Sequence, residues 1–128
     1  MKLIISLFMI SLVACCSSKQ ASSNDIVVMN GNTGEAYPTA PSCIKDLVRK
    51  FASEPKENPP RKVFQYNYRG NVVYYVTAIC CDQYSDLFDG NCNLLGHPDG
   101  GITGKGDGKL PDFNKEKTGE TLVWEDKR

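Results

Sequence analysis

Residues 61–81 read RKVFQYNYRGNVVYYVTAICC, and this stretch decides the fold of the chain. Most of its positions are β-branched or aromatic, which suits two half-buried β-strands. Gly70 lies between them, with Arg69 before it and Asn71 after it. Gly and Asn tolerate the positive φ that a tight hairpin turn needs. The stretch therefore predicts a β-hairpin.

The length of the turn is not evident from the sequence, so which residues share a face of this hairpin stays open. A loop of two or four residues places Tyr66 on the same face as Tyr75, whereas a loop of three residues places it with Tyr74. The second strand is apolar on both faces, so we expect it in the centre of a sheet. The first strand is more polar, and we expect it nearer an edge.

The N-terminus has the features of a bacterial lipoprotein signal peptide. Lys2 is followed by the apolar run Leu3–Ala14, which is shorter than the ~20 residues of a membrane-spanning helix. Leu12-Val13-Ala14-Cys15 resembles a lipobox, which implies diacylglyceryl transfer to Cys15 and cleavage before it. We expect a membrane partner through this lipid anchor, in the bacterial outer membrane. No acidic run follows Cys15, which favours the periplasmic face over the cell surface.

The chain divides into three parts. Residues 1–14 form the signal peptide, residues 15–40 a flexible tether rich in Ser, Asn, Gly and Thr, and residues 41–128 one domain. Within the tether, Ile26–Met29 is apolar, and we expect it to pack on the domain or to form an edge strand. The less favoured alternative is that it docks a partner by adding a strand. The formal net charge is zero, which gives no reason to expect nucleic acid as a partner.

A helix is predicted before the hairpin. Ser42 is the expected N-cap, and Glu54 ends the helix because the residue before Pro55 avoids the α region. Apolar residues recur at helical spacing at Ile44, Leu47, Val48 and Phe51. This stripe is expected to cover one face of the sheet.

Six cysteines are present, and four lie in the predicted domain: Cys43, Cys80, Cys81 and Cys92. Export implies an oxidising compartment, which allows disulfides. Because Cys80 and Cys81 are adjacent and point to opposite faces of a strand, we expect one to pair with Cys43 and the other with Cys92. No C-x-x-C pair is present, so zinc and redox-dithiol sites are not predicted.

The rest of the chain predicts a second, shorter hairpin and a returning strand. Asp89-Gly90-Asn91 is a turn signal, and Thr121–Trp124 suits a last strand. The expected fold class is α+β: one N-terminal helix packed on an antiparallel, four- to five-stranded meander sheet, with a long Gly/Asp-rich loop.

That loop, Gly96–Phe113, offers two candidate sites. Asp99, Asp107 and Asp112 supply oxygen ligands for calcium, although turn chemistry by glycines and aspartates explains the same residues and is favoured. The other candidate is a partner-binding surface made of Gly100, Gly101, Gly104, Lys105, Gly106, Asp107 and Gly108.

No nucleophile motif is visible, and His97 is the single histidine, so we predict that the protein is not an enzyme. The expected function is a non-enzymatic envelope lipoprotein that binds an envelope protein, in the manner of an inhibitor. The alternative is a structural or carrier domain stabilised by calcium; no other cofactor is expected.

The segments PSCI, VVYYV, CCDQYSDLFD, GGITGKGDGKLPDF and LVWED together resemble an uncharacterised domain family of small bacterial lipoproteins, chiefly of Bacteroidota-type bacteria. The resemblance covers nearly all of residues 41–128. It implies a location and a domain boundary, and it implies no site.

Overall fold

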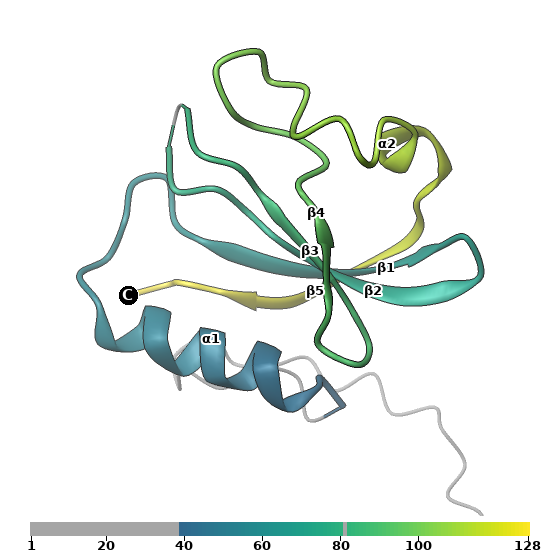
Figure 1. Cartoon of the computed structure of the whole chain (residues 1–128). Coiled ribbons are helices and arrows are strands. Elements are labelled where there is room, and N and C mark those ends of the chain that lie inside the picture. The colour runs from purple at the N-terminus through teal and green to yellow at the C-terminus, as the bar shows by residue number, and fades with distance from the viewer. Residues whose placement is uncertain (1–38, 81) are drawn as a thin grey trace, which may run out of the picture.

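Three layers make up the part of the chain described by the computed structural model, residues 39–80 and 82–128 (Figure 1). A five-stranded sheet lies in the middle, a helix covers one face, and a long loop covers the other. In chain order, the elements are α1 (Ser42–Ser53), β1 (Lys62–Tyr68), β2 (Asn71–Val76), β3 (Asp86–Asp89), β4 (Leu94–Gly96), α2 (Phe113–Glu116) and β5 (Thr118–Glu125). The strand order is β4-β3-β2-β1-β5, and every pair is antiparallel.

The predicted hairpin forms β1 and β2. Arg69 and Gly70 alone connect them, with φ of 49° and 78°, as a type I′ turn requires. This two-residue turn places Phe64 opposite Tyr75, which decides between the two predicted registers. β2 is the central strand and β1 is one place from the edge, as predicted.

Helix α1 differs from the prediction at its start. Its N-cap is Pro41, not Ser42, and the Pro41 carbonyl accepts hydrogen bonds from the N–H groups of Ile44 and Lys45, both at 3.1 Å. Proline suits this position because it has no N–H group, and an N–H here would have no acceptor within the helix. Pro41 itself is extended, with φ of −63° and ψ of 160°, and Ser42 is the first helical residue. The helix also lies in the interior of the chain, not at the N-terminus as predicted, since residues 1–38 precede the described part. It ends before Glu54, as expected.

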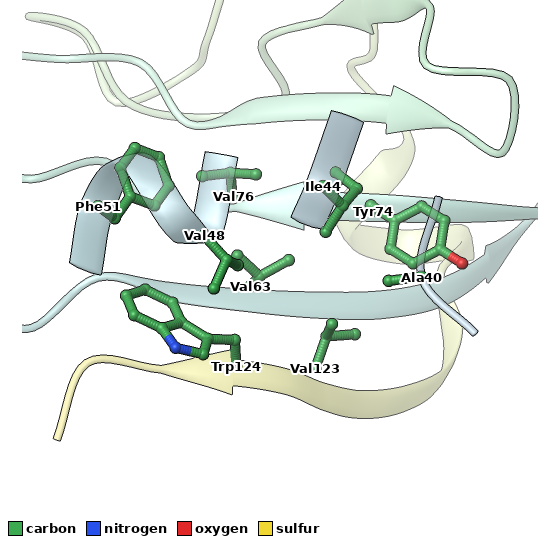
Figure 2. Packing of buried hydrophobic residues seen from close by; sticks show 9 residues of the cluster. All are labelled: Ala40, Ile44, Val48, Phe51, Val63, Tyr74, Val76, Val123 and Trp124. Atoms are coloured by element: carbon green, nitrogen blue, oxygen red, sulfur yellow. The ribbon is translucent and has the colours of Figure 1, made fainter. Parts of the chain in front are cut away.

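The helix-side core joins α1 to the sheet. Phe51 and Trp124 lie at one end of it, with ring centroids 6.2 Å apart, and Ala40 and Tyr74 lie at the other (Figure 2). Its buried members are Ala40, Ile44, Val48, Phe51, Val63, Tyr74, Val76, Val123 and Trp124. The predicted apolar stripe of the helix therefore packs on the sheet as expected, with Leu47 half-buried beside it.

The loop-side core occupies the opposite face of the sheet. Its buried members are Tyr66, Tyr68, Val73, Leu87, Leu110 and Phe113. Phe113 is fully buried, and its ring centroid lies 5.2 Å from that of Tyr68 and 5.8 Å from those of Tyr66 and Tyr75. The long loop is thus a structural layer of the domain. The one-turn helix α2, which begins at Phe113, was not predicted because four residues are too few to show a period.

The predicted disulfide pairing is wrong. Cys43 bonds to Cys92, with their Cα atoms 5.8 Å apart, so neither pairs with Cys80 or Cys81. The turn between β3 and β4 lies beside the start of α1, which brings Cys92 to Cys43 (Figure 1). β2, by contrast, runs from the start of α1 toward its end, with Tyr74 near Ile44 and Val76 nearer Phe51 (Figure 2). Cys80 is also disulfide-bonded, and Cys81 lies outside the described residues.

Candidate functional site

Two aspartates tie the Gly/Asp-rich loop to tyrosines of the sheet. The Tyr75 hydroxyl donates a hydrogen bond to Asp99 Oδ2 at 2.7 Å and lies 3.0 Å from Ser85 Oγ. The Tyr68 hydroxyl donates to Asp112 Oδ1 at 2.7 Å, and the Arg69 guanidinium pairs with the other oxygen of Asp112. Both ends of the loop are therefore fixed to the same face of the sheet.

These contacts shift the pKa values of the tyrosines and of Asp112. Burial, followed by the hydrogen bond to Asp112, raises the pKa of Tyr68 to about 12. The hydrogen bonds from Tyr68 and Arg69 lower the pKa of Asp112 to about 2. Burial also raises the pKa of Tyr75. At neutral pH the tyrosines are therefore neutral donors and Asp112 is a charged acceptor.

Backbone hydrogen bonds brace the tip of the loop. The Gly101 N–H donates to the Gln83 carbonyl at 3.1 Å, and the Gly106 N–H donates to the Gly100 carbonyl at 3.1 Å. A Cβ on Gly100 would lie 2.2 Å from the Gln83 carbonyl oxygen. A glycine is needed there because the two backbones approach too closely for any side chain.

Ile102 occupies the apex of this braced tip. Its side chain is 91% exposed, the highest value among the exposed large hydrophobic residues of the described chain. The Gly104 N–H donates to the Gly101 carbonyl at 3.0 Å, which closes a tight turn with Ile102 at its corner. Single exposed apolar side chains are common on proteins. The backbone that carries this one, however, is braced by hydrogen bonds on both sides of it.

The residues predicted as a partner-binding surface all lie in this segment, from Gly100 to Gly108. Lys105 is exposed, and its N–H lies 3.4 Å from Thr103 Oγ1. The prediction did not single out Ile102. Its signal was present in the sequence, because Ile102 is the one large aliphatic residue in a run of glycines and polar residues.

The three aspartates predicted as possible calcium ligands have separate partners. Asp99 and Asp112 accept from different tyrosines, and Asp107 Oδ1 accepts from the Lys109 N–H at 3.0 Å. The other oxygen of Asp107 is buried without a hydrogen bond, and Lys109 Nζ lies 3.5 Å from it. The hydrogen bond from Lys109 lowers the pKa of Asp107. Within residues 39–80 and 82–128, no three His, Cys, Asp or Glu side chains form a group that could hold a metal ion.

His97 packs at the base of the loop. Its ring stacks on that of Tyr84, with centroids 5.1 Å apart. Its Nδ1 lies 2.9 Å from Asp86 Oδ1, without the geometry of a hydrogen bond. This contact holds the base of the loop against the start of β3.

A pocket of about 540 Å³ opens at the other end of β3, between the two hairpin turns. Its lining includes the aliphatic residues Val72, Leu95 and Leu110 and the polar residues Asn71 and Asn91. The sequence did not predict this pocket, because its walls come from turns and strands far apart in the chain.

Some predicted features lie outside the described residues. These are the signal peptide, residues 15–38 of the tether with Ile26–Met29, the lipidation residue Cys15, and Cys81. Ala40, predicted as part of the tether, is instead buried in the helix-side core. Among the described helices, none has the length and apolar character needed to cross a membrane.

Comparison with known proteins identifies a family for most of the domain. No curated protein and no solved structure was found to match the chain. A family model described as a domain of unknown function (DUF6970) matches residues 49–126, from within α1 to the end of β5. This match covers more than half of the chain and confirms the predicted relationship to an uncharacterised family. The chain belongs to the DUF6970 family.

Proposed function

We propose that this chain is an envelope lipoprotein whose domain binds a protein partner through the tip of the Gly/Asp-rich loop, as a non-enzymatic, inhibitor-like module. The observation that carries the proposal is Ile102, 91% exposed at the apex of a braced turn. A rigid loop loses little conformational entropy when it binds. An aliphatic side chain presented in this way can fill a pocket of the partner as a central anchor.

The surroundings of Ile102 suggest the chemistry of the partner surface. Thr103 and Gly104 are exposed beside it, and Lys105 adds an exposed positive charge directly after the turn. We therefore expect an apolar pocket with an acidic rim on the partner, because complementary charge speeds and orients the encounter.

Cross-linking of the intact lipoprotein in its native envelope tests the proposal. Three chains are compared: the natural chain, Ile102→Ser and Leu94→Ser. Leu94 is a matched control because it is also a large aliphatic side chain, 51% exposed, but lies on the edge strand β4. A partner that is enriched with the natural chain and Leu94→Ser, and lost with Ile102→Ser, supports the loop as the binding surface. Equal enrichment with all three chains contradicts it.

The lipid anchor has a separate test. In the natural chain, labelled fatty acid should be incorporated at Cys15. Cys15→Ala should abolish this label and leave an uncleaved or soluble protein, because the acyl chains provide the membrane affinity. Label that persists in Cys15→Ala contradicts the assignment.

Calcium stabilisation of the loop is the second candidate, and one observation favours it. Asp107 Oδ2 is buried and accepts no hydrogen bond from the described residues; the cation beside it is the exposed Lys109 ammonium at 3.5 Å, which a calcium ion would have to displace. Calcium that binds only the folded state should raise the melting temperature of the natural chain and leave that of Asp107→Asn unchanged. An unchanged melting temperature in both chains at millimolar calcium contradicts this candidate.

A further inference from the structure

Lys117 places its ammonium group against three aromatic rings. Lys117 Nζ lies 4.6 Å from the ring centroid of Tyr66, 5.0 Å from that of Phe113 and 5.5 Å from that of Tyr75. A single cation–π contact is common in proteins, whereas three rings around one ammonium form a cage. We call these three rings the aromatic cage.

The cage is assembled from segments that are distant in the sequence. Tyr66 lies on β1, Tyr75 on β2 and Phe113 at the start of α2. Tyr66 and Phe113 meet edge to face at 89°, and Phe113 stacks on Tyr75 at 21°. Because Phe113 is fully buried and Tyr66 is only 4% exposed, the positions of the rings are fixed by the loop-side core.

Carboxylates hold the polar ends of both cage tyrosines. The Tyr66 hydroxyl donates to Glu120 Oε2 at 2.6 Å, and the Tyr75 hydroxyl donates to Asp99 Oδ2 at 2.7 Å. These acceptors place negative charge beside the cage, which makes the site more favourable for a cation.

A lysine ammonium is a poor chemical match for this site. It carries three N–H donors, and each donor that turns from water toward a ring exchanges a hydrogen bond for a ring face. Within the described part of the chain, Lys117 Nζ forms no ion pair or side-chain hydrogen bond, and its contacts are the three rings. A quaternary ammonium has no N–H group to satisfy, so it fits an aromatic cage without this cost.

We propose that the aromatic cage is a binding site for a trimethylammonium group, and that Lys117 occupies it as an internal substitute until such a ligand displaces it. This site is separate from Ile102 and does not depend on the proposed protein-binding function. The ligand is an alkyl trimethylammonium such as choline, either free or as a lipid headgroup.

The position of Lys117 permits this displacement. It lies between α2 and β5, and its backbone N–H donates to the Phe113 carbonyl at 2.9 Å. This bond can stay while the half-buried side chain rotates away, so neither element needs to unfold. Asp99 and Glu120 also predict a selectivity: choline should bind better than glycine betaine, whose carboxylate they would repel.

The test is titration of the full-length chain with tetramethylammonium, choline and glycine betaine, followed by NMR of the tyrosine ring protons. In Lys117→Ala the cage is no longer occupied, so tetramethylammonium should bind saturably and shift the Tyr66 and Tyr75 resonances. The natural chain should bind more weakly, by about tenfold if Lys117 fills the cage nine-tenths of the time. Choline should follow tetramethylammonium, and betaine should bind less well.

Two further variants make the outcome decisive. Lys115→Ala removes the same charge from an exposed position of α2 and should bind like the natural chain. Lys117→Gln keeps much of the length of the side chain without its charge and should bind like Lys117→Ala, which excludes an artefact of truncation. Native near-UV circular dichroism of each variant shows that the cage is intact. An intact Lys117→Ala and Lys117→Gln that show no saturable shift overturn the proposal.

Vesicles distinguish the two sources of the ligand. Shifts of the same tyrosine resonances with vesicles that contain phosphatidylcholine, and none with phosphatidylglycerol, assign the site to a lipid headgroup. Shifts with free choline alone assign it to a small soluble ligand.

Discussion

Two glycines of the loop share a backbone conformation and differ in their surroundings. Gly104 has φ of 68°, and a Cβ placed on it would have no neighbouring atom within 4 Å, whereas a Cβ on Gly106, with φ of 70°, would lie 1.9 Å from the His97 carbonyl oxygen. Gly104→Ala should cost about 1–2 kcal/mol for the left-handed conformation alone. Gly106→Ala should cost about 3 kcal/mol or more, because the backbone must also move. Urea unfolding followed by circular dichroism measures both, and equal losses contradict the close approach.

Asp112 predicts part of the acid sensitivity of the fold. Its folded pKa of about 2 lies below the ordinary value of 3.8, so its ionised form stabilises the native state above about pH 4. That stabilisation is lost as the pH falls from about 4 through about 2. Asp112→Asn should therefore melt earlier than the natural chain near neutral pH, and the gap should shrink toward about pH 2. A gap that stays constant across this range, or an equal effect of Asn at the exposed Asp82, contradicts the assignment.

At the scale of the elements, one covalent bond joins α1 to the β3–β4 turn. Cys43 and Cys92 are 49 residues apart, and closing a loop of that length in the unfolded chain corresponds to about 4 kcal/mol of stability. The double variant Cys43→Ser/Cys92→Ser should lose about this much in urea unfolding under oxidising conditions. In a strong reductant the natural chain and the double variant should become equally stable. A difference in stability that persists in the reductant would show that the serines change the stability by an effect other than loss of the disulfide.

In the molecule as a whole, two hydrophobic cores lie on opposite faces of one sheet. Trp124, the single tryptophan, reports on the helix-side core, whereas Tyr66 and Tyr68 report on the loop-side core. Because β1 and β2 contribute residues to both cores, loss of either face should destabilise the other. We expect tryptophan fluorescence and NMR of the Tyr66 and Tyr68 ring protons to give the same urea midpoint, as for a two-state domain. A tyrosine transition at lower urea would show that the loop layer unfolds separately.

The sequence by itself determined the local structure. Gly70 and its neighbours specify a tight turn, and the β-branched and aromatic residues on either side specify the strands. The spacing of apolar residues specifies α1, and Asp89-Gly90-Asn91 specifies the second hairpin. These features depend on residues within a few positions of each other, so their physical causes are visible in a single stretch of chain.

Only the tertiary structure decided which distant residues meet. Cys43 pairs with Cys92, Asp112 accepts from Tyr68 across 44 positions, and Phe113 completes a second core. The aromatic cage around Lys117 has the same origin. Each of these contacts joins segments that have no local signal for one another. Which segments meet follows from the simultaneous packing of both faces of the sheet, and no single stretch of sequence encodes that packing.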